Sequence, residues 1–169
     1  MRHSTDDGPL EYFDTRIDGT VAVRLIASPH GLREIQFSPV DRDGAQQNHR
    51  NSLIIEAVSQ LEAYFSGHLR RFDLPLDMRG TAFQLRVWKE LQSISYGETR
   101  SYASVAAAIG SPAAVRAVGA ANGANPISII VPCHRVIGAN GKLVGYGGGL
   151  PLKQRLLELE GTVPMRLPV

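Results

Sequence analysis

The sequence has almost no cysteine, no long apolar run and no recognisable export signal. Cys133 is the only cysteine among 169 residues, which excludes an internal disulfide and favours a reducing compartment. No apolar run approaches the roughly 18 residues that a membrane helix needs. The start, MRHSTDDGPLEYF, lacks the apolar core of a secretory signal. These absences predict a cytoplasmic protein that does not enter membranes.

The histidines are not arranged in a way that could bind a metal. The five histidines are scattered, and only the Cys133-His134 step brings one next to a cysteine. Two adjacent side chains are too few ligands for a zinc site. The sequence therefore predicts neither a metal nor another cofactor.

Charge is distributed unevenly along the chain. Residues 1–78 contain eight basic and twelve acidic residues, a net charge of −4, whereas residues 79–160 contain nine and four, a net charge of +5. A basic region is favourable for contact with a polyanion such as nucleic acid. We therefore expect any nucleic-acid partner to bind the second part of the chain.

Residues 1–78 have the pattern of a small domain with a sheet and one helix. The segments TVAVRLIAS and LREIQFS alternate with period two and are separated by a turn, which predicts two strands. The polar segment DRDGAQQNHRN predicts a loop. In SLIIEAVSQLEAYFSG, apolar residues recur at helical spacing and Gly67 follows, which predicts a helix.

Residues 79–169 have the pattern of a mostly helical second domain. Thr81 and Gln84 have the spacing of a capping box at the start of a helix. A short helix over 101–109 and a second helix beginning with Ser111 as N-cap and Pro112 at its first position outline a helix-turn-helix, which we expect to be of the winged kind. The fold class predicted for the whole chain is α/β of the α+β kind.

The segment from 127 to 161 is expected to contain a strand, a turn and a closing helix. ISIIV predicts a short buried strand, GANGK a turn centred on Asn140 and Gly141, and PLKQRLLELEG a helix that ends at Gly161.

The residues around Cys133 point to a reactive thiol, although a lone cysteine is usually a small buried apolar residue. The thiolate is the nucleophilic form, and positive charge on His134 or Arg135 would lower the pKa of Cys133. Pro132 could turn the cysteine toward a cleft, and the glycines of GYGGG permit a flat ligand to approach the backbone.

Three motifs carry a resemblance to a known family. Residues 132–136 read PCHRV, preceded by YGETRSYASVAAAIGSPAAVRAVGAANGANP and followed by GYGGGLPLKQRLLELEG. Over about Arg79 to Gly161 the chain resembles the O6-alkylguanine-DNA alkyltransferases. Membership implies a DNA repair protein that flips the damaged nucleotide and transfers its alkyl group irreversibly to its own cysteine. That cysteine matches Cys133, so the protein would react once.

The resemblance implies a role for each matching residue. Cys133 is the nucleophile, activated through a water by His134, which Glu160 holds. Tyr102 serves guanine N3, Asn125 ties the recognition helix to the active-site turn, and Arg116 occupies the place of the flipped base. The helix docks in the minor groove. The implied DNA contacts are Ser101, Tyr102, Ala114, Val115, Arg116, Ala117, Gly119 and Arg135, and the implied substrate pocket is Val136, Tyr146, Gly147 and Gly148.

Several points stay open. Gly147 stands where some relatives carry a serine that donates to O6, and Asn122-Gly123 stands where some carry a larger side chain over the alkyl pocket. The range of alkyl groups, the preference between O6-alkylguanine and O4-alkylthymine, and cooperative binding of this expected monomer to DNA are not decided. A cysteine hydrolase using Cys133 and His134 is the alternative enzyme, and a lesion-binding protein without transfer is the alternative binder.

Overall fold

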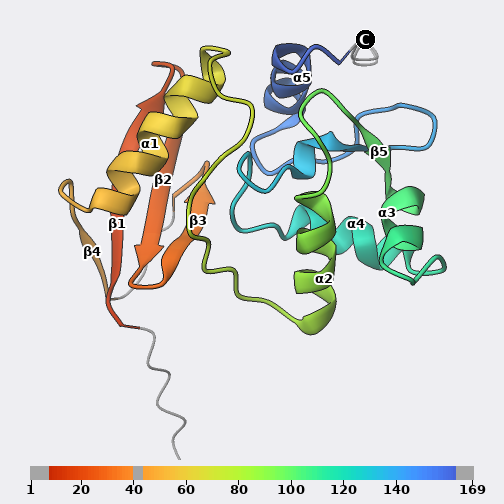
Figure 1. Cartoon of the computed structure of the whole chain (residues 1–169), viewed down its shortest axis with the longest axis horizontal. Coiled ribbons are helices and arrows are strands. Elements are labelled where there is room, and N and C mark those ends of the chain that lie inside the picture. Colours follow the sequence, from red (N-terminus) through yellow and green to blue (C-terminus); the bar gives the residue numbers. More distant parts are fainter. Residues whose placement is uncertain (1–7, 40–43, 163–169) are drawn as a thin grey trace, which may run out of the picture. The chain divides into compact units, whose positions relative to one another are not determined.

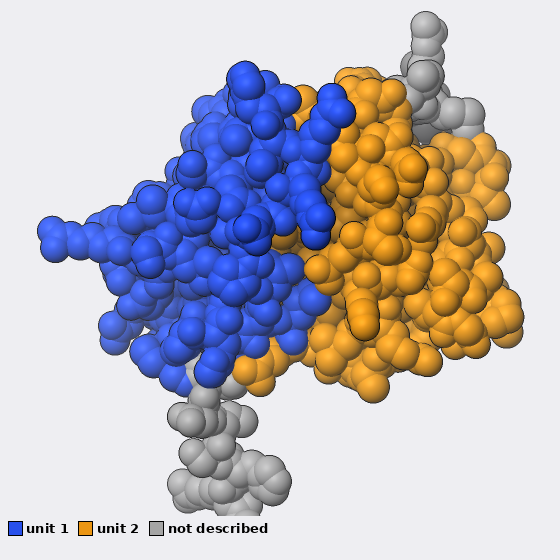
Figure 2. All heavy atoms as spheres, viewed as in Figure 1, with its two compact units in different colours: residues 1–78 blue, residues 79–169 orange. Residues whose placement is uncertain are grey.

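The computed structural model describes residues 8–39 and 44–162. The chain divides into two compact units, with the boundary between Met78 and Arg79 (Figure 1, Figure 2). We call them unit one and unit two. No helix within these two described ranges is long and apolar enough to cross a membrane.

Unit one contains a four-stranded sheet in the order β3-β2-β1-β4. The β1–β2 and β2–β3 pairs are antiparallel, and β4 pairs parallel to β1. The strands are β1 (Leu10–Ile17), β2 (Val21–Ser28), β3 (Gly31–Gln36) and β4 (Ala45–Gln47). Strands β2 and β3 lie where the sequence predicts them. Strand β1 was not predicted, because charged residues break its alternation, and β4 lies in a segment predicted as a loop.

An ion pair between the buried Arg24 and the exposed Asp14 explains how charge enters this sheet. The guanidinium of Arg24 on β2 donates from Nε and Nη2 to the two carboxylate oxygens of Asp14 on β1, at 2.7 and 2.8 Å. These residues face each other in the β1–β2 register. Opposite charges placed across a strand pair stabilise the pairing, so Asp14 is a strand residue although its charge weakens the sequence pattern.

The helix α1 (Ser52–Phe65) packs on β1, β2 and β3 (Figure 1). The Asn51 side chain caps its first turn by accepting from the Ile54 amide at 3.0 Å. The predicted apolar stripe is buried at Ile54, Ala57, Leu61, Tyr64 and Phe65. Unit one is therefore a sheet covered by one helix, as the sequence predicts.

Unit two is mostly helical. Its first helix, α2 (Ala82–Leu91), begins with the predicted capping box, in which the Thr81 and Gln84 side chains each bond the other residue's amide. The Trp88 indole donates to the Ala121 carbonyl at 2.8 Å, which joins α2 to α4 (Val115–Gly123) in the core. The predicted order of a sheet domain followed by a helical domain is confirmed.

The helices α3 (Tyr102–Ala108) and α4 pack against each other, but α4 begins later than predicted. Ser111 is not its N-cap. The Ser111 amide donates to the Ala106 carbonyl at 2.9 Å and its carbonyl accepts from Ala114 at 2.9 Å, so Ser111 closes α3 and opens a turn. Helix α4 therefore starts at Val115 without a side-chain cap. The winged helix-turn-helix stays a prediction.

The predicted strand over 127–131 is wrong. The segment is buried, but the Val131 amide donates to the Ile127 carbonyl at 2.9 Å, so the chain folds back on itself. The Asn125 amide group donates to the Val131 carbonyl at 2.8 Å, and its oxygen accepts from the Ile127 amide at 3.1 Å. One side chain thus occupies backbone groups that a strand would offer to a neighbouring strand. Ile129 adopts a φ of 75° within this tight loop.

The remainder of unit two brings the cysteine next to the last helix. A short 3₁₀ helix, η1 (Cys133–Arg135), follows the loop and leads into β6 (Val136–Ile137). Strand β6 pairs parallel to β5 (Arg100–Ser101). The predicted turn over 138–142 is present, since Gly138 and Lys142 are joined by a backbone hydrogen bond of 2.9 Å. The final helix, α5 (Leu150–Leu159), packs against η1.

Candidate active site

Cys133 lies in the first position of η1 and is only 4% exposed. Its amide donates to the Val131 carbonyl at 2.8 Å, which fixes the turn just after the Asn125 loop. Its sulfur lies 4.0 Å from the Ser128 hydroxyl oxygen. The cysteine is thus held by the loop that Asn125 organises, rather than exposed in an open cleft.

The electrostatics of Cys133 differ from the sequence-based expectation. The pKa of the thiol is raised because burial disfavours the thiolate. Hydrogen bonds from Asn125 and Ser128 and the charge of Lys153 act in the opposite direction and lower it. The expectation that His134 and Arg135 would lower this pKa is wrong, because both side chains are engaged with Glu160.

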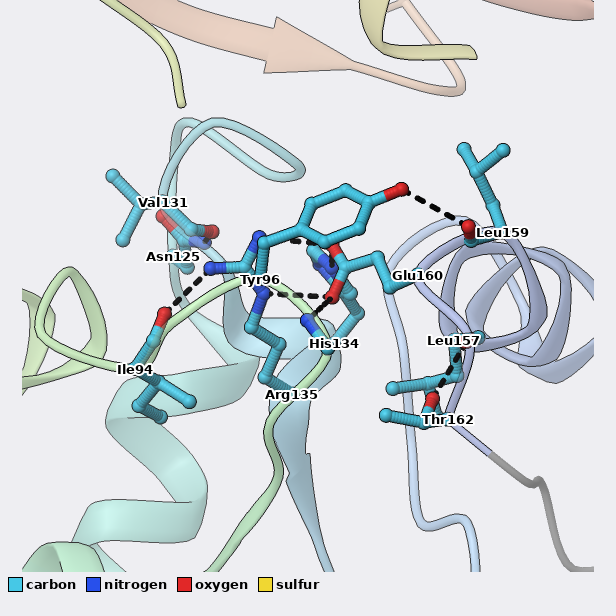
Figure 3. A network of polar contacts seen from close by, with 11 residues as sticks. Ile94, Tyr96, Asn125, Val131, His134, Arg135, Leu157, Leu159, Glu160 and Thr162 are labelled. Carbon is cyan, nitrogen blue, oxygen red and sulfur yellow. Dashed lines mark hydrogen bonds and ion pairs between the residues drawn. The ribbon is translucent and has the colours of Figure 1, made fainter. Parts of the chain in front are cut away.

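Glu160 is the centre of a buried network (Figure 3). His134 Nε2 lies 2.8 Å from Glu160 Oε1. Arg135 donates from Nε to Oε2 at 2.9 Å and from Nη2 to Oε1 at 2.8 Å. Its Nη1 donates to the Ile94 carbonyl at 2.5 Å, and the Gly97 amide donates to Glu160 Oε2 at 3.3 Å. The predicted pairing of His134 with Glu160 is present.

This network holds the Arg135 side chain in the interior of unit two. The residue is only 7% exposed, and its guanidinium is bonded to Glu160 and to a backbone carbonyl. A buried guanidinium needs such partners because its desolvation is costly. Arg135 therefore serves the internal network, which leaves its side chain little surface for the predicted contact with DNA.

His134 is held in its neutral form. The pKa of the imidazole is lowered, mainly because burial disfavours the imidazolium, although the bond to Glu160 and its charge raise it. Since the Glu160 carboxylate can only accept, Nε2 carries the hydrogen and Nδ1 is the basic nitrogen of the ring. A neutral imidazole of this tautomer can take up a proton.

Lys153 is a functional candidate that the sequence analysis missed. It is completely buried on α5, and its ammonium donates to the carbonyls of Val136, Val144 and Gly145 at 2.7, 2.9 and 3.5 Å. Burial lowers the pKa of Lys153 to about 8, while the charge of Cys133 raises it. The sequence does indicate the burial of Lys153, because this residue lies on the same helical stripe as Leu156 and Leu157. Both leucines are buried.

A cavity of about 570 Å³ lies between α3, α4 and the segment before α5. Several residues implied by the resemblance are brought together in its wall, and four others join them. The implied residues are Tyr102, Val115, Arg116, Gly119, Tyr146 and Gly147; the additional ones are Asn122, Gly123, Val144 and Gly145.

Asn122 connects this cavity with the cysteine. Its amide nitrogen donates to the Cys133 carbonyl at 3.4 Å, while its side chain forms part of the cavity wall. Burial raises the pKa of the Tyr102 phenol. The charge of Cys133 raises this pKa further, so Tyr102 also lies close to the cysteine. Tyr102 also donates to the Val144 carbonyl at 3.2 Å. Cys133 is therefore directly behind the cavity wall.

The other implied residues are placed as follows. Ser101 caps α3, its hydroxyl accepting from the Ser104 amide at 3.1 Å. Ala114 precedes α4, and Ala117 is exposed on it. Val136 is fully buried, and neither Val136 nor Gly148 lines the cavity, although both were predicted to lie in the substrate pocket. Within residues 8–39 and 44–162, no three His, Cys, Asp or Glu side chains are grouped to hold a metal.

Comparison with known proteins identifies the family. Residues 11–78 match the 6-O-methylguanine DNA methyltransferase ribonuclease-like domain, and residues 82–162 match the DNA binding domain of the same family. A methylated-DNA–protein-cysteine methyltransferase from Methanosarcina barkeri is 62% identical over 152 residues, which are 88% of this chain and 96% of the relative. The chain belongs to the 6-O-methylguanine DNA methyltransferase family.

Other family members support the same assignment. The enzyme of that name from Mycolicibacterium paratuberculosis is 67% identical over 104 residues, 62% of this chain, and the match spans 63% of the relative's length. A crystal structure of Mycobacterium tuberculosis OGT in complex with DNA is 50% identical and superimposes with a TM-score of 0.79, covering 89% of this chain and 91% of that one. Both units of the chain thus have counterparts in the methyltransferase family.

Proposed function

We propose that the protein repairs DNA by transferring the alkyl group of O6-alkylguanine to Cys133. The observation that carries this proposal is the position of the cysteine. It is buried directly behind the wall of a 570 Å³ cavity and next to a neutral His134 held by Glu160. A cavity of this size lies within the range of about 300–1,000 Å³ that is typical of small-molecule sites.

The reaction begins with a proton transfer between two neutral groups. The Cys133 thiol passes its proton to His134 Nδ1, through a bridging water in the route that the family resemblance implies. The resulting imidazolium is stabilised by Glu160, which lies 2.8 Å from the ring, and the thiolate is stabilised by the charge of Lys153. The raised pKa of the resting thiol therefore protects it until a substrate is bound.

The transfer itself is a displacement at carbon. A lone pair of the Cys133 sulfur forms the S–C bond, the C–O6 bond breaks, and its electron pair stays with guanine, which then takes up one proton. Donors near guanine O6 and N3 stabilise the developing charge. Tyr102 is the donor we assign to N3, and the backbone amides near Tyr146 and Gly147 are suited to O6, where this chain has no serine.

Access to the base requires that the nucleotide leave the duplex. Unstacking and unpairing cost a few kcal/mol, which inserted side chains must offset. Arg116 lines the cavity and is exposed on α4, so it is suited to fill the space that the base leaves. The small residues of α4 allow this helix to lie in the minor groove, whose degenerate edges suit a protein that finds lesions in any sequence.

Intact-mass spectrometry after incubation with an O6-methylguanine duplex tests the proposal. We expect one methyl mass per chain, located on Cys133, and a plateau at one equivalent because the thioether product has no acceptor. Cys133→Ser should bind the methylated duplex and transfer nothing. Transfer by the serine variant would contradict the proposal, and repeated turnover on an ester would favour the cysteine hydrolase instead.

A further inference from the structure

The side-chain amide of Asn122 has a fixed orientation. Its nitrogen donates to the Cys133 carbonyl at 3.4 Å. Because a carbonyl oxygen only accepts hydrogen bonds, the nitrogen and not the oxygen of the amide must face Cys133. The Asn122 side chain also forms a hydrogen bond with the Tyr102 phenol. This bond lowers the pKa of the phenol, although burial raises it by more. The Asn122 Oδ1 atom is left on the other side of the amide.

That oxygen is a buried acceptor with no hydrogen-bond partner in the part of the chain that the structure describes. Asn122 itself is only 5% exposed. Leaving a buried acceptor unpaired costs about 1–3 kcal/mol, and such atoms are rare in folded proteins. An unpaired acceptor in the wall of a cavity indicates a donor that arrives with the ligand.

The position of Asn122 shows which part of a ligand can supply this donor. The residue lines the cavity and touches Cys133, and both residues are nearly closed to solvent. Any movement that lets an alkyl carbon reach the sulfur must therefore bring that alkyl group past the neighbouring amide. The transferred group is therefore the part of the ligand that comes nearest to the Asn122 amide.

We infer that Asn122 selects among alkyl groups by accepting a hydrogen bond from a donor on the group that is transferred. This inference rests on the proposed function. A methyl or propyl group has no donor and leaves Oδ1 unpaired. A 2-hydroxyethyl group carries a hydroxyl two bonds beyond the carbon that the sulfur attacks and can satisfy it. O6-(2-hydroxyethyl)guanine should thus be preferred over O6-propylguanine, which has the same number of heavy atoms.

A competing donor is the 2-amino group of guanine. Every O6-alkylguanine carries this group, so its pairing with Asn122 would give no preference between hydroxyethyl and propyl substrates. The comparison of two alkyl groups of equal size therefore separates the two possibilities. It also separates hydrogen bonding from simple widening of the pocket, which would favour both groups alike.

The test is a set of single-turnover transfer rates from duplexes that carry O6-methyl-, O6-(2-hydroxyethyl)- or O6-propylguanine. The readout is the hydroxyethyl-to-propyl rate ratio, compared between the wild-type protein and Asn122→Leu. We expect this ratio to fall about 3- to 10-fold in the variant, the range of one net hydrogen bond. Taking ratios within each protein cancels the loss of active protein and the intrinsic reactivity of each alkyl group.

Gly123→Ala is the matched control. Gly123 also lines the cavity, and a Cβ there would meet nothing within 4 Å, so the substitution alters the wall and keeps the amide. Its ratio should equal the wild-type ratio. If Asn122→Leu does not fold, the affinities of Cys133→Ser for the two duplexes replace the rates, and a preference of about 3-fold or more for hydroxyethyl supports the inference.

The outcomes distinguish the inference from the function on which it rests. Methyl transfer with the same hydroxyethyl-to-propyl ratio in wild type and Asn122→Leu, or equal affinities of Cys133→Ser for both duplexes, would overturn the role of Asn122 and leave the proposed function intact. No transfer from any of the three duplexes would overturn both.

Discussion

Cys133 combines a nucleophile with an environment that keeps it protonated. Burial raises the pKa of the thiol, and burial also lowers the pKa of His134, so both groups are neutral at rest. Moving one proton between them creates a thiolate and an imidazolium, each next to a group of opposite charge. Because the charges appear only after the proton moves, the sulfur is protected from other reactants before the proposed substrate binds.

Lys153 pairs with the thiolate in this scheme, at a cost to stability. Burial lowers the pKa of Lys153 to about 8 in the folded protein, against about 10.4 for lysine in an unfolded chain. Between these two pH values the unfolded chain binds the proton and the folded chain does not. The free energy of unfolding should therefore rise with pH across that window, and the cost is fully present below pH 8.

The prediction is measured as a difference between two proteins. In a Cys133→Ser background, the free energy of unfolding of the protein with Lys153 should gain about 1–3 kcal/mol relative to Lys153→Met between pH 7.5 and pH 10. Urea unfolding at each pH gives the values. The serine background removes the thiol, whose raised pKa contributes stability that is lost as pH rises.

Lys142→Met is the control for the loss of a lysine as such, because Lys142 lies on an exposed turn. Its difference from the parent protein should be the same at both pH values. A pH-independent difference for Lys153→Met as well would contradict the assignment of a buried, weakly basic lysine.

Residues of the site differ in how far the sequence could identify them. Cys133, His134 and Asn125 stand in short motifs, so the sequence could single them out and the family resemblance could assign each a role. The environment of Cys133 was not, because Arg135 is drawn to Glu160 and the cation near the sulfur comes from α5. Contacts between distant segments decide which charge acts on which group, and local sequence does not contain them.

At the scale of elements, one asparagine shapes the segment before the active site. The Asn125 side chain occupies the backbone groups of Ile127 and Val131, so an apolar run with strand character becomes a tight loop. The start of α4 shifts for a similar reason, since Ser111 is used to close α3. Capping boxes and apolar stripes were read correctly because they are local, whereas these two errors involve side-chain or turn hydrogen bonds that override propensity.

Helix α4 places a single arginine at the cavity, and this placement gives a prediction. Arg116→Ala should slow transfer from a duplex by about tenfold or more and change transfer from single-stranded DNA little. The reason is that only the duplex requires unpairing and unstacking, which cost a few kcal/mol. Single-turnover rates on matched duplex and single-stranded oligonucleotides measure the effect.

Arg86→Ala provides the control, since Arg86 is an exposed arginine on α2 that does not line the cavity. It should affect both substrates equally. If Arg116→Ala slowed both substrates to the same extent, the arginine would be needed for chemistry or binding rather than for base flipping.

At the scale of the whole molecule, the two units differ in charge. Residues 1–78 carry a net charge of −4 and residues 79–160 carry +5. The basic unit also contains the cavity, the cysteine and α4, so the proposed function places DNA binding and alkyl transfer in the same unit. The division near residue 78 was indicated by the change in net charge and not by periodicity, because unit one contains the helix α1 as well as its sheet.

Alkylation of Cys133 should lower the stability of the whole protein. The sulfur lies in a residue that is 4% exposed, close to Ser128, so an added methyl group must displace packed atoms. Overpacking of this kind costs about 1–3 kcal/mol, and for a chain of this length each kcal/mol lowers Tm by about 2–4 °C. Under the proposed function the thioether persists, so we expect no recovery of the original stability.

Calorimetry on the protein before and after complete methylation by an excess of O6-methylguanine duplex, with the DNA removed, should show Tm falling by about 3–10 °C. A larger alkyl group should lower Tm further, because it displaces more atoms. Cys133→Ser treated in the same way should keep its Tm, since it accepts nothing. An unchanged Tm in fully methylated protein would mean that space beside the sulfur already accommodates the product, and the close packing assigned to Cys133 would be wrong.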